Sequence, residues 1–335
     1  MLRLIQVCHS VHGRRVGVVT GKRCQLLDRF RSAYALVQWA LASSEGLEAV
    51  VNGHASGERL DYDAIYVGES KWKLLSAFDH PEEPGRCLVS GTGLTHMASA
   101  KNRDAMHEKG DDAQMTDSMK MFQWGVDGGS PRPGRIGAQP EWFYKGIGAI
   151  LRAHGEALDV PSFADDGGEE PEIAGVYVID GDGNPRRVGF VMGNEFADHV
   201  MEKKNYLYLA PSKLRHGSIG PELIVGADFG NVSGTVSIER KGNTVWSKGI
   251  KTGEKNMSHS LANLEYHHFK YEPHRRVGDV HIHFFGADAF SFGEGFALED
   301  GDVMVVEWKG FGRALRNPIR ISKENEKYIK IKDIL

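Results

Sequence analysis

The chain has 335 residues, of which 41 are Lys or Arg and 45 are Asp or Glu, so its formal net charge is −4. That length can bury the core of one large domain or of two unequal domains. The weak negative charge argues against nucleic-acid binding, and no segment approaches the ~20 apolar residues that cross a bilayer. The three cysteines have no paired spacing, which is typical of a reducing compartment, so we expect a cytoplasmic protein.

The first part of the chain predicts a small domain of its own. Residues 15–20 and 23–27 have the pattern of short strands, and residues 30–42 carry apolar side chains at helical spacing. We therefore expect an N-terminal α+β cap domain over residues 1–84 and a catalytic domain over residues 85–335.

A polar stretch follows over residues 100–135, with Asp111, Asp112 and a run rich in Gly and Pro at 128–134. This composition predicts a helix and then a mobile loop. Because long loops beside a site often close over it, we hypothesise that the stretch acts as a lid.

Downstream, the sequence predicts a mixed, β-rich α/β fold. Runs of branched and aromatic residues indicate strands at 172–179, 188–192, 223–225, 233–240, 244–248 and 303–308. Residues 258–270 predict a helix with Ser258 as its N-cap.

Three acidic residues at strand ends indicate a metal site. Glu170 and Glu172 are two residues apart, and residues two apart on a strand project from the same face. Glu195 follows the next strand, which could place a third carboxylate beside them. Three converging carboxylates repel unless a cation neutralises them, and oxygen ligands favour Mg²⁺, Mn²⁺ or Ca²⁺. The alternative is that the acidic pair is simply solvated.

Four segments, in order, resemble motifs of the fumarylacetoacetate hydrolase superfamily. Residues 140–146 (Pro-Glu-Trp-Phe-Tyr-Lys-Gly) are similar to its Pro-x-x-Phe-x-Lys segment, and residues 170–174 (Glu-Pro-Glu-Ile-Ala) to its Glu-x-Glu-Leu-Ala metal motif. Residues 193–198 (Gly-Asn-Glu-Phe-Ala-Asp) lie where the family has Asn-Asp-Val-Ser-Ala-Arg-Asp, and residues 298–318 resemble its C-terminal Gly-Asp…Asn-Pro segment. The resemblance implies the family's fold, Glu170, Glu172 and Glu195 as metal ligands, and a homodimer or larger assembly.

The chain departs from the family at two places. The third ligand is Glu195, where the family usually has aspartate. Residues 281–288 occupy the region of the family's Thr-Gly-Thr-Pro substrate loop.

Within the superfamily, the resemblance is closest to dehydratases of 2-keto-3-deoxy sugar acids, including a subgroup associated with arabinose degradation. Residues 206–220 are similar to that branch, and Glu141 and Lys213 fall where it places an acidic residue and a lysine. The implied reaction removes water from a 2-keto-3-deoxypentonate in non-phosphorylative sugar catabolism, giving the semialdehyde of 2-oxoglutarate.

The chemistry of this reaction suggests the role of each residue. A divalent ion that chelates a 2-keto acid stabilises the charge that develops when a C3 proton leaves. Lys213 is the candidate base, because a nearby cation and burial lower a lysine pKa, and Glu141, among aromatic residues, is the candidate acid. Lys145 holds the substrate carboxylate, pairs with Glu170 or is merely exposed. The other candidate substrate contacts are Thr92, Ser218 and Gly286.

Two other functions stay open. One is metal-dependent C–C bond hydrolysis of a diketo acid to pyruvate and a second acid. It needs a water-activating dyad, and His96 lacks the glutamate that would complete one nearby, although a remote carboxylate could serve. The other is a catalytically silent binding protein, against which Glu141 and Lys213 argue.

The histidines of the last third suggest no further chemistry, because no nucleophile motif accompanies them. We expect His259, His267 and His268 to be packed or exposed. His281 and His283 merit a test, because they precede the loop that should face the substrate.

Overall fold

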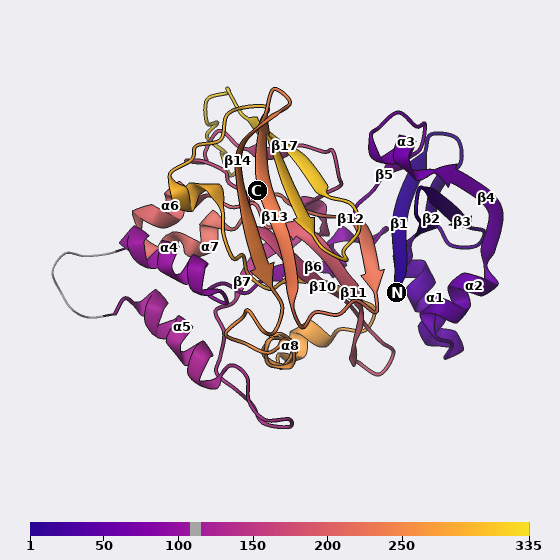
Figure 1. The fold of residues 1–335 in the computed structure, drawn as a ribbon, viewed down its shortest axis with the longest axis horizontal. Coiled ribbons are helices and arrows are strands. Elements are labelled where there is room, and N and C mark those ends of the chain that lie inside the picture. Colours follow the sequence, from indigo (N-terminus) through magenta and orange to yellow (C-terminus); the bar gives the residue numbers. More distant parts are fainter. Residues whose placement is uncertain (108–114, 335) are drawn as a thin grey trace.

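The computed structural model describes residues 1–107 and 115–334. Within these residues, two β-sheets form the framework and helices surround them (Figure 1). The strands of the larger sheet are β1 (Leu2–His9), β2 (Gly13–Thr20), β3 (Arg23–Leu27), β4 (Ala55–Asp61), β5 (Lys73–Leu74), β6 (Cys87–Gly91), β7 (Phe143–Ile147), β8 (Leu151–Arg152), β10 (Pro171–Ile179), β11 (Pro185–Asn194), β12 (Gly217–Val225) and β15 (Val280–Phe284). Those of the smaller sheet are β9 (Leu158–Val160), β13 (Val232–Arg240), β14 (Asn243–Thr252), β16 (Val303–Trp308) and β17 (Leu315–Ile321).

The helices lie around the sheets and between the strands. They are α1 (Ala33–Ser43), α2 (Leu47–Gly53), α3 (Tyr62–Tyr66), α4 (Met97–His107), α5 (Asp117–Gly128), α6 (His199–Lys204), α7 (Leu209–Ser212) and α8 (Leu261–Phe269). Short 3₁₀ turns occur at η1 (Pro84–Arg86), η2 (Gly148–Ile150), η3 (Tyr206–Tyr208), η4 (Glu272–Arg275) and η5 (Ser291–Glu294). None of the helices in the described part of the chain has the length and apolar character that crossing a membrane requires.

The central part of the larger sheet has the order β1-β12-β11-β10-β15-β6-β7, and β4-β3-β2 extend it beyond β1. The smaller sheet has the order β14-β13-β16-β17-β9. The two sheets pack against each other, since Ile173 and Met192 of the larger sheet share one apolar cluster with Val236, Val306 and Trp308 of the smaller. The mixed, β-rich α/β class predicted from the sequence is confirmed.

Strand β10 lies at the centre of this arrangement. The sequence pattern predicts a half-buried strand, but all nine of its residues are buried. The reason is that both faces are covered: Ile173 packs in the cluster between the sheets, whereas Ala174, Val176 and Val178 pack in a second cluster with α1. A strand that carries glutamates at its start is therefore embedded in apolar surroundings, where charge is costly.

The N-terminal strands and α1–α3 form one end of the molecule (Figure 1, indigo). They are joined to the rest through pairing of β1 with β12, and through Glu222, whose carboxylate accepts hydrogen bonds from Arg3 and, at 2.9 Å, from Tyr62. The α+β content of this part agrees with the predicted cap, and the boundary at residue 84 stays a prediction.

The predicted helices begin later than expected. The helix predicted from residue 30 begins at Ala33, because the Ser32 hydroxyl accepts from the Ala35 N–H at 3.0 Å. The cap of α8 is Ser260, not Ser258. Helices α4 and α5 occupy the stretch predicted as helix and loop, and Asp111 and Asp112 lie outside the described residues.

Candidate metal centre and active site

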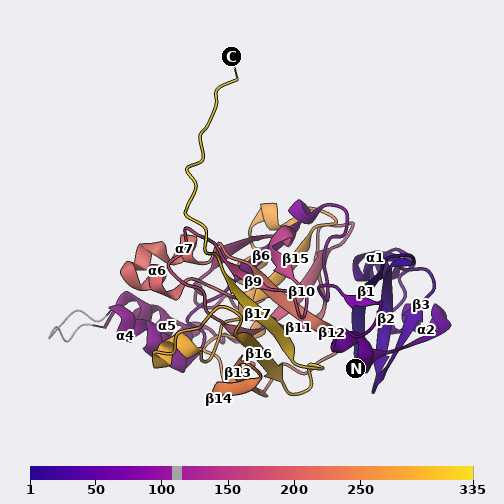
Figure 2. The same ribbon diagram turned by 90° about the horizontal axis from the view of Figure 1, so that it is seen from above.

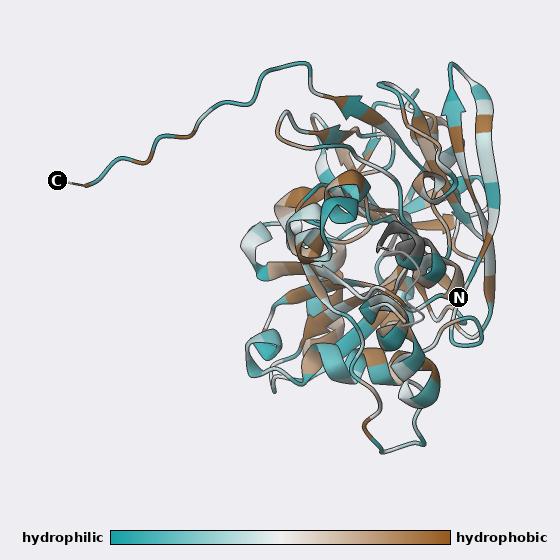
Figure 3. Ribbon diagram, turned by 90° about the vertical axis from the view of Figure 1, so that its left-hand side faces the viewer, coloured by the Kyte–Doolittle hydropathy of each residue, from teal (hydrophilic) through white to brown (hydrophobic). Residues whose placement is uncertain are grey.

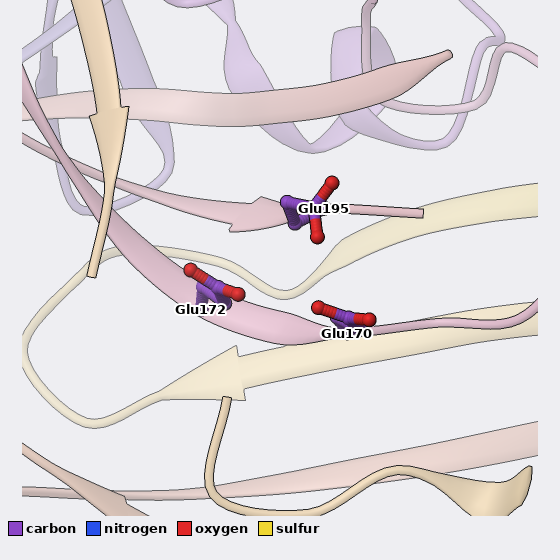
Figure 4. A group of neighbouring side chains, drawn as sticks. All are labelled: Glu170, Glu172 and Glu195. Atoms are coloured by element: carbon purple, nitrogen blue, oxygen red, sulfur yellow. The ribbon is translucent and has the colours of Figure 1, made fainter. Parts of the chain in front are cut away.

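Three glutamates meet at one end of the β10–β11 hairpin. The antiparallel register pairs Glu172 with Gly193 and Pro171 with Asn194, so Glu170 and Glu195 each lie one residue beyond that last pair. The Glu195 N–H donates to the Glu170 carbonyl at 2.9 Å, which continues the pairing. One carboxylate oxygen of each glutamate lies within 4.8 Å of the others (Figure 4). The hairpin thus produces the convergence that the spacing predicts.

The carboxylates are buried and repel one another. Burial raises the pKa of Glu172 well above its ordinary value, and the charges of Glu195 and Glu170 raise it further. Burial also raises the pKa of Glu195, to about 7, although nearby lysines oppose this. The pKa of Glu170 is well below its usual range, because Lys213 and His199 outweigh the effect of burial. A cation shared by the three groups would relieve the repulsion.

The Lys213 side chain forms ion pairs with two of the three carboxylates. Its Nζ is 2.6 Å from Glu170 Oε1 and 2.7 Å from Glu195 Oε2, and it lies 4.8 Å from the centre of the Phe143 ring. The lysine follows α7, which ends at Ser212, and it is 1% exposed. Lys213 therefore lies within the acidic cluster, where its amine faces the atoms that a bound ligand would approach.

Lys145 is buried and pairs with Glu195. Its Nζ is 2.6 Å from Glu195 Oε1 and donates to the carbonyls of Phe196 at 2.6 Å and Lys213 at 3.1 Å. Burial lowers the pKa of Lys145, and Glu195 opposes that shift. The sequence leaves Lys145 open between the substrate carboxylate, Glu170 and simple exposure. Exposure is wrong, because Lys145 is 1% exposed, and its ion pair is with Glu195 and not with Glu170.

The donor set fits a divalent cation. Lys145 pairs with Glu195, and Lys213 contacts both Glu170 and Glu195. All three candidate ligands are oxygens, which suits Mg²⁺, Mn²⁺ or Ca²⁺.

His199, which sequence reasoning missed, is also part of the site. Its Nε2 lies 3.0 Å from Glu170 Oε1, the oxygen that Lys213 also contacts. A small cavity lies at the cluster. His199 and Glu202, which is one turn further along α6, both line it. A signal for His199 existed, because it lies four residues after Glu195 in the segment that carries the third glutamate, but the residue type alone indicated no role.

Glu141 is buried and 5% exposed. The neighbouring Trp142 donates through Nε1 to His268 Nδ1 at 3.1 Å, and the Phe143 ring faces Lys213. These contacts place the two aromatic residues that follow Glu141 in the sequence, and the role of Glu141 as acid stays a proposal.

The other candidate substrate contacts have different environments. Gly286 lines the cavity, and its N–H donates to Glu172 Oε2 at 2.7 Å. The Thr92 hydroxyl is 2.9 Å from Nε2 of His283, which is one of the two histidines before the predicted substrate loop. The Ser218 hydroxyl donates to the Arg152 carbonyl at 2.9 Å. Of these three, Gly286 is the one in contact with a candidate metal ligand.

His96 is buried, and hydroxyl groups contact both of its ring nitrogens. Nδ1 is 2.9 Å from Thr95 Oγ1, and Nε2 is 3.1 Å from Thr252 Oγ1. Burial lowers the pKa of His96 to about 3, so the ring is neutral. Neither nitrogen is bonded to a carboxylate in the described part of the chain, which gives no support to a water-activating dyad.

The cavity at the cluster is small. It has a volume of about 20 Å³, and its lining includes Glu170, Glu172, Lys213, His199 and Gly286. A space of that size holds one water molecule or ion. A larger cavity of about 610 Å³, lined in part by Asp165, Lys203 and Phe296, includes none of the three glutamates.

Comparison with known proteins supports this picture at the level of the fold. No family model matches the chain. A curated relative, the 2-dehydro-3-deoxy-D-arabinonate dehydratase of Saccharolobus solfataricus, is 28% identical over 121 residues, which are 35% of this chain and 39% of the relative. The match thus spans less than two thirds of the relative's length.

Solved structures match over nearly the whole chain. A 2-keto-3-deoxyarabinonate dehydratase has a TM-score of 0.70 at 18% identity, covering 96% of this chain and 100% of its own. The same coverage holds for a 2-keto-3-deoxy-D-arabinonate dehydratase complexed with magnesium and 2,5-dioxopentanoate, with a TM-score of 0.69 at 17% identity.

The chain has the fold of these dehydratases. A 2-hydroxyhepta-2,4-diene-1,7-dioate isomerase from Mycobacterium marinum also matches, with a TM-score of 0.59 at 13% identity over 97% of this chain and 100% of its own. The expectation of a fumarylacetoacetate hydrolase-like fold is confirmed.

Proposed function

We propose that the protein is a divalent-metal-dependent dehydratase of a 2-keto-3-deoxy sugar acid. The main support is the buried cluster of Glu170, Glu172 and Glu195 with Lys213 on two of its carboxylates. The substrate class follows from the solved relative that holds magnesium and 2,5-dioxopentanoate, because that compound is the semialdehyde of 2-oxoglutarate. A 2-keto-3-deoxypentonate is therefore the first substrate to test.

Each residue of the cluster has a role in this proposal. Glu170, Glu172 and Glu195 hold the ion, and Gly286 fixes Glu172 through its N–H. When bound, Mg²⁺ or Mn²⁺ polarises the keto group and acidifies the neighbouring C3–H bonds.

Lys213 and Glu141 move the protons. Lys213, in its neutral amine form, takes a proton from C3, and Glu141 gives one to the C4 hydroxyl, which leaves as water. The remaining unsaturated acid becomes the semialdehyde by proton shifts alone. Both side chains are buried, as acid–base groups shielded from bulk water need to be. Because a five-carbon acid exceeds the present cavity, we expect lining residues such as Leu94 and Ser99 to shift when it binds.

The deciding experiment is mass spectrometry of products from a panel of 2-keto-3-deoxypentonates, 2-keto-3-deoxyhexonates and diketo acids, each with Mg²⁺, with Mn²⁺ and with chelator. Metal-dependent loss of one water from a sugar acid supports the proposal. Pyruvate with a second acid would identify a hydrolase instead. No product from any substrate would contradict the dehydratase and favour a binding protein.

We further propose that the protein is a homodimer or larger homo-oligomer in the cytoplasm. Residues 323–334 leave the body as an extended segment (Figure 2), with apolar residues set among polar ones (Figure 3). Tyr328, Ile329 and Ile331 are 92%, 80% and 82% exposed, which favours burial against a second copy. Truncation after Ser322 should lower the molar mass measured by light scattering, and an unchanged mass would contradict this role. Free Cys8, Cys24 and Cys87 agree with a reducing compartment.

A further inference from the structure

Contacts to its backbone segment and to its ring fix the position of His199. It is the first residue of α6, whose N-cap Asp198 accepts from the Met201 N–H at 2.9 Å and from Arg215 Nη2 at 2.6 Å. The Asp198 carboxylate also accepts from the Asp165 N–H at 3.0 Å. The backbone that carries His199 is thus fixed by a buried charged network.

The imidazole ring is fixed as well. It stacks on Phe290 with ring centres 4.7 Å apart and planes 9° apart, and Phe292 lies 5.2 Å away at 27°. Gly168 lies against the ring, because a Cβ at that position would come within 2.5 Å of His199 Nδ1. These contacts restrict the rotation of the ring and help to orient Nε2.

That direction is the Glu170 carboxylate. His199 Nε2 is 3.0 Å from Glu170 Oε1, and Lys213 Nζ is 2.6 Å from the same oxygen. Because Oε1 already accepts from two donors, we expect Glu170 to offer Oε2 to a cation. The arrangement selects the orientation of the carboxylate before any ion binds.

We propose that His199 is a positioning residue, which holds Glu170 in its ion-binding orientation. The inference rests on the proposed function, because it assumes that the glutamates bind a divalent cation. Partners that orient a metal ligand typically contribute 10–100-fold to metal affinity. His199 is expected to act through Glu170, without touching the ion or the substrate.

The test is calorimetric titration of the full chain with Mn²⁺, without substrate. His199→Phe keeps an aromatic ring between Phe290 and Gly168 but removes the N–H donor, so Mn²⁺ affinity should fall about 10–100-fold. His199→Gln restores an N–H donor and should recover most of the affinity. If the Phe variant does not fold, the Gln variant against His199→Leu makes the same comparison.

A matched control is His154→Phe. His154 also stacks on an aromatic ring, with its centre 4.3 Å from that of Tyr66, and its Nε2 contacts the Tyr66 carbonyl, away from the glutamates. This variant should bind Mn²⁺ like the wild type. Equal affinity of His199→Phe and wild type would overturn the role of His199 alone. If the wild type binds no Mn²⁺, the metal site of the proposed function fails, and the role of His199 fails with it.

Discussion

Glu195 Oε1 and Lys145 Nζ lie 2.6 Å apart, and neither side chain has any exposed area. Removing two charges from water together is tolerable only with close pairing and further hydrogen bonds, which the carbonyls of Phe196 and Lys213 provide. This ion pair therefore joins the strand end that carries one candidate ligand to the segment that carries the candidate base.

Replacing Lys145 by Met should destabilise the metal-free protein by about 3 kcal/mol or more, because it leaves part of the Glu195 charge buried without its partner. Urea unfolding at pH 7 with chelator measures this. Arg320→Met is the control, since Arg320 is 69% exposed in its pair with Asp159 and should cost under about 1 kcal/mol. Equal losses in the two variants would contradict a structural role for the buried pair.

Replacing Lys213 by Ala should lower kcat by about 10³-fold, as expected for loss of a general base, while Mn²⁺ affinity stays within a few-fold of wild type or rises. The rise has a simple cause: Glu170 and Glu195 lose a competing cation at 2.6 and 2.7 Å. Steady-state kinetics and Mn²⁺ titration separate the two effects. A variant that loses metal binding as well would show that Lys213 builds the site and would count against its role as base.

Glu172→Gln should abolish the stabilisation of the protein by Mg²⁺. Burial and two like charges raise the pKa of Glu172, so a neutral amide should leave the Tm of the metal-free protein unchanged or higher. Mg²⁺ should then no longer raise the Tm, whereas in the wild type Mg²⁺ at a hundred times its Kd adds about 2.7 kcal/mol. Differential scanning fluorimetry with and without Mg²⁺ tests this, with Glu239→Gln as a control outside the cluster. A full Mg²⁺ shift in Glu172→Gln would remove Glu172 from the ligand set.

Gly286→Ala should damage both folding and metal binding. The backbone at Gly286 has φ +99°, and an added Cβ would lie 2.0 Å from Thr95 Oγ1. We expect a loss of more than about 1 kcal/mol in unfolding free energy and weaker Mn²⁺ binding, because the N–H that holds Glu172 is displaced. Gly301→Ala, with φ +89° and no atom near the added Cβ, isolates the backbone cost. If both variants bind Mn²⁺ like wild type, the Gly286 N–H does not position Glu172.

The histidines of β15 should make the protein sensitive to acid. Burial lowers the pKa of His281 and of His283 from 6.5 to about 3. Between these values the unfolded chain binds protons that the folded chain excludes, so stability falls as the pH falls, by about 1.4 kcal/mol per unit for each histidine. Urea unfolding at pH 7, 6 and 5 should show a shallower dependence for His281→Asn than for wild type. The exposed His12→Asn variant should keep the wild-type slope, and identical slopes in all three proteins would contradict the prediction.

Much of the fold follows from local pattern, but long-range partners do not. Strands such as β13 and β16 and the convergence of the glutamates could be predicted, because alternation and turn residues act within a few positions. The cap of α8 could not, because both Ser258 and Ser260 are plausible caps. The Ser258 N–H donates to the Thr95 carbonyl at 2.8 Å and holds that residue outside the helix.

The same limit applies to the site. The motifs that flank Glu170 and Glu195 pointed to the three glutamates, yet Lys145 and His199 received no definite partner. Their contacts depend on segments 50 and 29 residues away in sequence, which only the assembled fold brings together.

The position of the three glutamates depends on the register of the β10–β11 hairpin, and therefore on the turn that joins the two strands. The turn between the two strands is set by Asp180, which accepts hydrogen bonds from the N–H groups of Asp182 and Asn184 at 3.0 and 2.8 Å. A strand of β10's length places this turn roughly 30 Å from Glu170. An inserted or deleted residue there would slip one strand along the other, and a slip of one position turns every following side chain to the opposite face. A change in loop length on the surface would therefore dismantle the acidic cluster while leaving each of its glutamates in the sequence.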